Sequence, residues 1–360
     1  MRRIIILFII ILAYILPIIL FKERAHLFAT LITIGIFAIA AIGLNILVGY
    51  CGLLNLGFAG FLCIGAYTAA ILMKACGFNF WIALIIAVLH TALWGLLLGL
   101  PMLGLSGDYF AIATFGFSEL VVLIAKNWQS LTGGTRGYPD IPRPGISIVF
   151  LKKFGLFPNT SSELLAYRFQ VLEKAPYWIL ILSFVLFSLF ITRRLIHSRL
   201  GRAWIALRED DLAASACGID DRVYKSIAFM VSAGFGGLAG ALQASYLANV
   251  DWHNFTFMIS VFILCYVVFG GMGTLIGPVV GTTILISLSE FLRSQLEIYR
   301  LNPDLRFLLY GAILILMIRF RPEGIIPSWR GKGKIGRPER ENPEKVPIRP
   351  SDIDSKIAEN

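Results

Sequence analysis

Long runs of apolar residues limit what this chain can fold into more than any other feature. The run IIILFIIILAYILPIILF at 4–21 holds no charged residue, and similar runs recur through most of the 360 residues, which gives a mean hydropathy of +0.77. A helix needs about 20 apolar residues to cross ~30 Å of hydrocarbon. Only helices and closed barrels satisfy their backbone in lipid, and these runs lack the alternation of barrel strands. The sequence therefore predicts an all-α integral membrane protein.

The runs divide into ten predicted transmembrane helices of roughly 20 residues each. We expect them near residues 4–21, 27–48, 56–73, 80–103, 109–126, 176–192, 223–247, 255–270, 277–293 and 305–320. An even number of spans places both ends of the chain on the same side of the membrane.

Basic residues indicate which side that is. The side that holds both ends has 19 of the 32 Lys and Arg: two at the N-terminus, seven in 193–225 and ten from Arg319 onward. Because cytoplasmic segments are enriched in Lys and Arg, both termini are predicted to be cytoplasmic, in a cell inner or plasma membrane. The 127–175 loop also carries basic residues on the opposite side, but long loops translocate largely regardless of charge.

The two ends of the chain differ in composition from the middle. Arg2 and Arg3 before an apolar run imitate a signal peptide, but the run is long and no small-residue cleavage site follows, so we expect an uncleaved first span. Residues 331–360 hold seven basic residues, six acidic residues and four prolines, a composition typical of disorder. The predicted organisation is a first span at 1–26, a main membrane domain at 27–325 and a charged, disordered cytoplasmic tail at 326–360.

Two glycine-rich segments interrupt the apolar pattern. In GYCGLLNLGFAGFLCIGAY at 49–67, the glycines keep no single helical spacing and Asn55 lies among them. This segment is either a broken helix that lines a polar pathway or a packed helix. In GGMGTLIGPVVG at 270–281, Gly273, Gly277 and Gly281 recur every four residues, which predicts a smooth helix face for close packing.

Signatures of catalysis and of cofactor binding are missing from the sequence. No Gly precedes Lys-Ser or Lys-Thr at phosphate-loop spacing, and GMGTLIG lacks the context of a dinucleotide site. The four His are not grouped, and the five Cys form no C-x-x-C pair. The net charge of +10 is spread between apolar runs, which argues against nucleic acid as a partner. We expect no cofactor, no metal and no enzymatic activity.

The segment 193–225 is charged, with 12 charged residues among 33 positions. Good helix formers from Ala203 to Cys217 predict a short helix across the cytoplasmic mouth, ended by Gly218, with Asp220 or Asp221 capping the next span. Apolar side chains on an exposed helix would need a partner surface, and the helix carries four of them: Trp204, Ile205, Leu207 and Leu212.

The order of the motifs carries a resemblance to a known family. The segments are GLNILVGYCGLLNLGFAGFLCIGAYTAAIL (43–72), DYFAIATFGFSELVVLIAKNW (108–128), LTGGTRGYPDIPRP (131–144), GRAWIALREDDLAASACGID (201–220), VFGGMGTLIGPVVG (268–281) and RFRPEGI (319–325). Together they resemble the M-type permease of branched-chain amino-acid ABC importers, the LivM family. Phe58 and Asn55 depart from the family pattern, which often has His and Ser there.

The resemblance implies a subunit that forms the translocation pathway for Leu, Ile, Val or related hydrophobic amino acids. Its implied partners are a homologous LivH-like permease, two cytoplasmic ATPase subunits that hydrolyse ATP, an external binding protein and the lipid bilayer. Two alternatives stay open: a urea or short-chain amide importer permease of similar sequence and, from another class, an ion-coupled secondary transporter. The latter would need buried carboxylates, for which Glu119 and Glu290 are nearly the only candidates.

The candidate site residues form two sets, of which the first rests on the resemblance and the second on polar residues within the spans. Ala213-Ala214-x-x-x-Gly218 is similar to the EAA loop that docks permeases onto ATPases, although Leu212 replaces its acidic residue and Asp211 lies one place earlier. The expected coupling residues are Arg202, Trp204, Arg208, Glu209, Asp210, Asp211, Ala213, Ala214 and Gly218. The expected pathway residues are Asn45, Asn55, Thr114, Ser118 and Glu119.

Glu119 is expected well inside the fifth span, about ten residues from Tyr109 and seven from Lys126. A carboxylate persists there only if it is paired, protonated or facing a wet pathway. Two roles stay open: a structural contact, such as one with the companion permease, or a contact with the ammonium group of a passing amino acid.

Overall fold

The computed structural model describes residues 25–102, 108–142, 175–298 and 324–327, with isolated positions at 311, 312, 315 and 319. The predicted first span at 4–21, most of the last span at 305–320 and the charged tail 331–360 lie outside these residues. The disorder of the tail and the position of both termini therefore stay predictions.

Helices make up nearly all of the secondary structure in the described ranges, as the apolar runs predict. In chain order the elements are α2 (Ala25–Asn45), the π-helix η1 (Ile46–Cys51), α3 (Phe58–Lys74), α4 (Phe80–Met102), α5 (Asp108–Asn127), α6 (Gln129–Thr132), η2 (Gly134–Arg136), β1 (Tyr138–Pro139), α9 (Ala175–Ile196), α10 (Arg199–Glu209), α11 (Asp211–Ala216), α12 (Asp221–Leu247), β2 (Asn249–Val250), η3 (Trp252–Phe255), α13 (Phe257–Gly270) and α14 (Gly277–Ile298). Each expected span from 27–48 to 277–293 corresponds to one of these helices.

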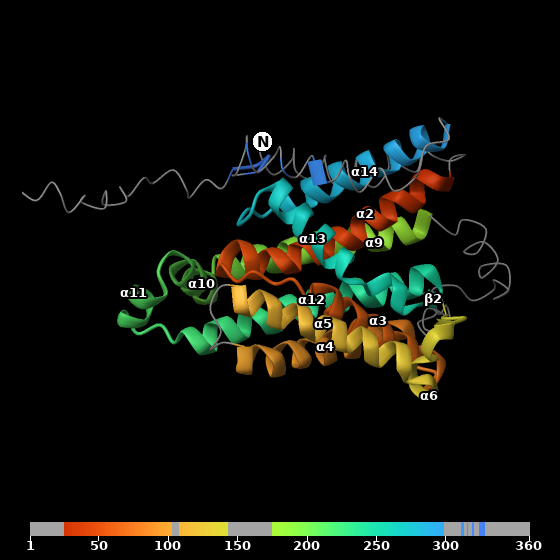
Figure 1. The fold of residues 1–360 in the computed structure, drawn as a ribbon, viewed down its shortest axis with the longest axis horizontal. Coiled ribbons are helices and arrows are strands. Elements are labelled where there is room, and N and C mark those ends of the chain that lie inside the picture. The colour runs from red at the N-terminus through yellow and green to blue at the C-terminus, as the bar shows by residue number, and fades with distance from the viewer. Residues whose placement is uncertain are drawn as a thin grey trace, which may run out of the picture.

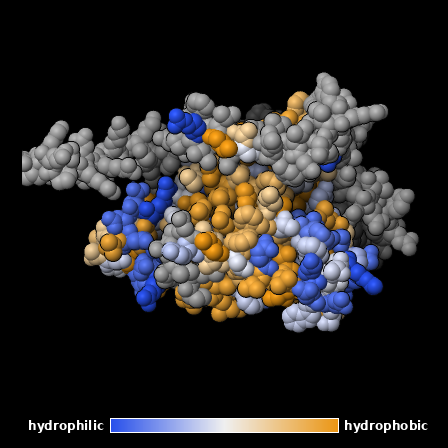
Figure 2. Space-filling view, viewed as in Figure 1, coloured by the Kyte–Doolittle hydropathy of each residue, from blue (hydrophilic) through white to orange (hydrophobic). Residues whose placement is uncertain are grey.

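The helices form an elongated bundle whose surface is divided into an apolar middle and two polar ends. Six helices in the described ranges are long and apolar enough to cross a membrane. Figure 2 shows a broad hydrophobic band around the middle of the bundle, with hydrophilic residues gathered at both ends. This distribution is that of a multi-pass membrane protein.

The two polar ends belong to different segments. The surface helices α10 and α11 lie at one end of the bundle, and α6 lies at the other, near β2 (Figure 1). There β1 pairs antiparallel with β2, Tyr138 opposite Val250. The charged segment after α9 and the start of the loop after α5 are thus separated by the length of the bundle.

Small residues on α12 bring the central helices close together. α12 packs against α2, α3 and α4, and it is buried along most of its length. A Cβ atom at Gly240 would overlap the carbonyl of Leu62 in α3, and one at Gly65 would overlap the backbone of Gly237. Close backbone contact of this kind is how membrane helices associate without a hydrophobic driving force between them.

The predicted glycine stripe at 273, 277 and 281 is only partly correct. Gly277 and Gly281 belong to α14 and lie against the end of α13, where a Cβ atom at either would crowd Gly270. Gly273 lies outside both helices, in the turn between them, with φ of +72°. The prediction was wrong for Gly273 because α13 ends at Gly270, and the backbone then adopts a left-handed conformation that favours glycine.

Candidate functional site

The charged segment after α9 folds into two short helices. Ser198 begins α10, and its side chain accepts a hydrogen bond from Leu200 N. Asp210 ends α10 in an extended conformation and caps α11, where its Oδ1 accepts hydrogen bonds from the backbone N–H groups of Leu212 and Ala213. The predicted single helix over 203–217 is therefore wrong. Aspartate is a strong N-cap residue, and here it interrupts a segment whose other residues favour helix.

One face of this helix pair is buried against the chain itself. The side chain of Trp204 is fully buried, and its Nε1 donates a hydrogen bond to the carbonyl of Tyr224 in α12 at 2.8 Å. Leu207 is buried as well, and Ile205 is partly buried. Three of the four apolar residues predicted to need a partner surface thus find one within the same chain, and only Leu212, 84% exposed, does not.

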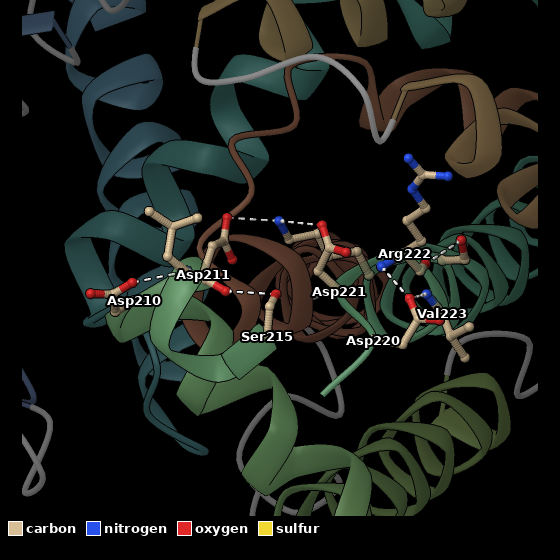
Figure 3. Close-up of polar contacts among 10 residues, drawn as sticks. Asp210, Asp211, Ser215, Asp220, Asp221, Arg222 and Val223 are labelled. Carbon is tan, nitrogen blue, oxygen red and sulfur yellow. Dashed lines mark hydrogen bonds and ion pairs between the residues drawn. The ribbon is translucent and has the colours of Figure 1, made fainter. Parts of the chain in front are cut away.

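A cluster of charges joins α11 to the start of α12. Lys225 Nζ lies 2.7 Å from Asp211 Oδ2 and 3.7 Å from Asp221 Oδ2, and the Lys225 side chain is only 10% exposed. Asp220 caps α12 by accepting hydrogen bonds from the N–H groups of Arg222 and Val223, as one of the two sequence alternatives proposed. Figure 3 shows these four aspartates, Asp210 included, where α11 meets α12. Together with the Trp204 hydrogen bond, these contacts hold α10, α11 and the start of α12 together as one unit.

The exposed surface of α11 consists of small residues and one large apolar side chain, besides Asp211 at its start. Leu212 and Ala213 are exposed, as are the residues from Ser215 to Gly218. Ala214, by contrast, is 5% exposed and faces the chain. Gly218 follows the helix with φ of +83°, and Ile219 N donates to the carbonyl of Ala214, which is the glycine stop that the sequence predicts. Of the two predicted alanines, only Ala213 is available to another protein.

The remaining predicted coupling residues are exposed. Arg202 and Glu209 lie on the outer side of α10. Arg208 differs, because its Nη1 donates a hydrogen bond to the carbonyl of Gly49 in the π-helix η1. Its Cγ also lies against Gly52, where a Cβ atom would be 3.1 Å away. Arg208 thus connects the surface helix α10 to a membrane helix 159 residues earlier in the chain.

Asn45 fastens the same membrane helix to the turn between α13 and α14. Its Oδ1 accepts a hydrogen bond from Gly273 N at 2.9 Å, and its Nδ2 donates one to the carbonyl of Thr274 at 2.8 Å. Both polar ends of the side chain are therefore used in a structural contact. The structure does not bring Asn45 together with the other expected pathway residues.

The glycine-rich segment 49–67 contains a broken helix. The π-helix ends at Cys51, residues 52–57 are not helical, and α3 begins at Phe58. The freed backbone groups find partners on other helices: Leu56 N donates to Thr114 Oγ1 in α5 at 3.2 Å, and Ala59 N donates to Ser260 Oγ in α13 at 2.8 Å. Gly57 N donates to the Asn55 side chain at 2.7 Å. The break that one of the two sequence alternatives proposed is confirmed, and its role as the lining of a polar pathway stays a prediction.

Two of the expected pathway residues, Asn55 and Thr114, lie at this break, and Ser118 lies close by, against Gly60 in the first turn of α3. Asn55, Thr114 and Ser118 are each at most 2% exposed. Asn55 Nδ2 and Ser118 Oγ have no hydrogen-bond partner among the described residues. Unpartnered polar atoms in a protein interior are costly, so the break is a polar site with unused hydrogen-bonding capacity in the middle of the bundle.

Glu119 points elsewhere. It lies near the middle of α5, as predicted, but on the exposed surface of the helix, next to Leu120, which is 59% exposed. Ser118 faces α3, and one residue further along a helix the side chain is rotated by about 100°. Glu119 therefore does not join the polar site at the helix break.

Sequence reasoning missed Ser260, Lys225 and Gly49, which complete these contacts. Ser260 is one hydroxyl in an apolar helix, and the acceptor at Gly49 is a backbone carbonyl, so neither gives a sequence signal. A lysine at the start of an apolar span, four residues after Asp221, is a signal that could have been used for Lys225.

Among the described residues, no group of three or more His, Cys, Asp or Glu could hold a metal ion.

Comparisons with known proteins agree with this architecture. A family described as "Branched-chain amino acid transport system / permease component" matches residues 26–318. The chain is 38% identical to the high-affinity branched-chain amino acid transport system permease protein LivM of Escherichia coli over 304 residues, 83% of this chain and 70% of that protein. It is 26% identical to the probable LivM of Methanocaldococcus jannaschii, over 83% of this chain and 92% of the relative.

A second kind of relative is more distant. The permease protein LivH of Salmonella typhimurium is 26% identical over 333 residues, 86% of this chain and 94% of that protein. The same organism has a LivM protein that is 38% identical to this chain. No solved structure gives a significant match.

Proposed function

Because the chain belongs to the branched-chain amino acid transport permease family, we propose that it forms the transmembrane pathway of an ATP-driven importer for leucine, isoleucine and valine. It pairs with a second, LivH-like permease, since relatives of both kinds occur in one organism. Two cytoplasmic ATPase subunits hydrolyse ATP, and an external binding protein delivers the amino acid. This chain performs no chemistry on its substrate.

The ATPase contact is the outer surface of α11. The exposure of Leu212 carries this assignment, because this leucine is 84% exposed at the polar end of the bundle (Figure 1) and belongs to the segment that is similar to the EAA docking loop. Ala213 lies beside it, and its small size leaves room for a side chain of the ATPase. The exposed Arg202 and Glu209 on α10 supply polar contacts around this apolar centre.

Movement of α11 reaches the membrane through contacts already present. Trp204 and Lys225 bind the helix pair to α12, and Arg208 binds it to η1. The chain continues from η1 directly into the broken segment 52–57, where Asn55, Thr114 and Ser118 form the polar part of the pathway. π-Helical segments occur frequently at functional sites, and a change in η1 would displace Asn55.

A matched pair of substitutions tests the docking surface. Ala213→Trp adds volume to the exposed surface of α11, so we expect the ATPase subunits to be lost from the purified complex and uptake of labelled leucine to fall, with the thermal stability of the permease unchanged. Ala214→Trp adds the same volume to a position that is 5% exposed, so it should lower the thermal stability of the permease itself. A complex that assembles and transports normally with Ala213→Trp would refute the docking assignment.

The orientation follows from the same proposal. The end of the bundle that carries α10 and α11 is cytoplasmic, and both termini are on that side. An impermeant thiol reagent added to intact cells should then label a cysteine at position 140 but not one at 2 or 340. Labelling at 340 would contradict this topology.

Competition of leucine uptake by valine but not by urea would separate the amino-acid importer from the amide alternative.

A further inference from the structure

The exposed surface of α5 has an unusual composition for a helix in a membrane. Tyr109 is 72% exposed, Ile112 64% and Leu123 53%, and their spacing places them along one side of the helix. Gly116 and Glu119 lie on the same side, between Ile112 and Leu123. Figure 2 shows a small hydrophilic area within the hydrophobic band, on the side of the bundle where α5 lies in Figure 1.

Glu119 cannot remain facing lipid as an isolated charge. It lies 11 residues from the start of α5 and eight from its end, which is close to the middle of the span. Glu119 forms no hydrogen bond or ion pair with another residue that the structure describes. Ionisable groups at this depth face a bundle interior or water and pair with a partner, because lipid offers neither hydrogen bonds nor charge stabilisation.

Gly116 makes the surface beside Glu119 flat. A Cβ atom added at Gly116 would meet nothing within 4 Å, whereas one added at Gly65 or Gly240 would overlap a neighbouring helix of this chain. Glycines in membrane helices permit close approach of another backbone, and within the chain Gly65 and Gly240 are used in this way. At Gly116 the position for such a helix is open.

The exposed surface of α4 provides a contrast. Ile85 is 60% exposed, Leu89 64% and Leu97 51%, and no glycine or carboxylate lies among them on the exposed positions of that helix. Bulky aliphatic side chains of this kind suit contact with lipid tails. The exposed His90 of α4 differs from Glu119, because both of its ring nitrogens have partners in this chain, Thr68 and Trp94. The two helices thus expose similar fractions of their side chains. The residues exposed on α4 are suited to lipid, whereas Glu119 on α5 needs a polar partner.

We propose that the surface of α5 around Gly116 and Glu119 binds the second permease subunit, with a helix of that subunit packed on Gly116 and a hydrogen-bond donor placed on the Glu119 carboxylate. The inference rests on the proposed function for the existence of that partner. A second copy of this chain is a poor occupant, because a symmetric contact would bring two Glu119 carboxylates together in a medium of low dielectric.

Site-specific photocrosslinking tests this assignment. A benzoylphenylalanine at Ile112 or Leu120 in the co-expressed complex should crosslink to the second permease, while the same group at Ile85 or Leu89 on α4 should not. Differently tagged copies of this chain identify self-association. Crosslinks from α5 to a second copy, or equal yields from α4 and α5, would overturn the proposal.

Substitutions at Gly116 and Glu119 extend the test to the two residues on which the proposal rests. Gly116→Leu should abolish most co-purification of the second permease, whereas Leu89→Ala on the α4 surface should leave it unchanged. Glu119→Gln keeps a hydrogen-bonding group of the same shape and should reduce co-purification less than Glu119→Leu. If a cysteine at position 119 reacts with an impermeant thiol reagent as fast as one at position 140 in the assembled complex, this surface faces water and the proposal fails.

These measurements are independent of the proposed substrate and of the ATPase contact. Pair assembly requires neither ATP nor an amino acid. A complex that crosslinks through α5 but takes up no leucine would refute the importer function and leave the interface standing. A complex that imports leucine but whose crosslinks to the second permease do not involve α5 would refute the interface and leave the importer function standing.

Discussion

Helices are interrupted in two regions of this protein, at Asp210 in the surface segment and at residues 52–57 in the membrane, and the two interruptions are stabilised differently. At Asp210 the cap comes from the residue itself, through hydrogen bonds to Leu212 and Ala213. At the membrane break one bond is local, from Gly57 N to Asn55, but Leu56 N and Ala59 N, the latter in the first turn of α3, depend on Thr114 and Ser260 from other helices. Water can replace a lost cap at the surface, but lipid cannot, so the membrane break requires contacts distant in sequence.

The comparison teaches that a local change should have local consequences at Asp210 and global ones at 52–57. Four substitutions test this difference, in order of decreasing expected effect on the stability of the purified permease in detergent.

Gly57→Val should have the largest effect. A Cβ atom at Gly57 would overlap the carbonyl of Thr114, so α3 and α5 would have to separate. We expect a loss of about 3 kcal/mol or more, seen as failure to accumulate folded protein or as a much lower unfolding temperature. Gly234→Ala is the control, because its nearest neighbours would be 3.7 Å away and it should be tolerated. A stable Gly57→Val protein would show that the break does not rely on α5.

Thr114→Val should have the next largest effect. It retains the shape of the side chain but removes the hydroxyl that accepts from Leu56 N, leaving a partly buried donor without a partner. The expected loss is about 1–3 kcal/mol, measured by thermal unfolding. Thr283→Val is matched to it, since the Thr283 hydroxyl is exposed and donates only within its own helix to Val279. Equal effects of the two substitutions would remove the distinction between the two regions.

Asp210→Ala should cost about 1 kcal/mol, the usual value of an N-cap, and should loosen only α11. Faster labelling of the exposed Cys217 by a thiol reagent would report this local change. Asp210→Asn preserves the capping acceptor and should be close to wild type. A loss of leucine binding or of membrane-helix packing in Asp210→Ala would contradict the local character of this break.

Asp211→Asn should have the smallest effect. The Lys225 amine keeps its second partner, Asp221, and the side chain of Asp211 is 54% exposed, so solvent screens the pair. We expect less than about 1 kcal/mol at low ionic strength and no measurable effect in 1 M salt. A larger loss that persists in salt would mean that this ion pair holds α11 more firmly than its exposure indicates.

Hydropathy, charge and cap signals determined much of this protein without a structure. The spans between 27 and 293, the charged segment, the Gly218 stop and an aspartate cap at 220 or 221 follow from residues close together in sequence, because chain length and side-chain chemistry alone decide whether a segment can cross lipid or end a helix. The structure selects Asp220 as that cap. The family is equally visible in the motifs.

Only the tertiary structure decided which way the side chains on those helices face. Ala213 and Ala214 are adjacent and identical, yet one is exposed and the other buried; Ser118 and Glu119 are adjacent and polar, yet one faces α3 and the other lies on the outer surface. Gly273 kept the four-residue spacing of a helix but lies in a turn. In each case the outcome depends on the rotation of a helix against neighbours distant in sequence, and spacing along the chain does not contain that information.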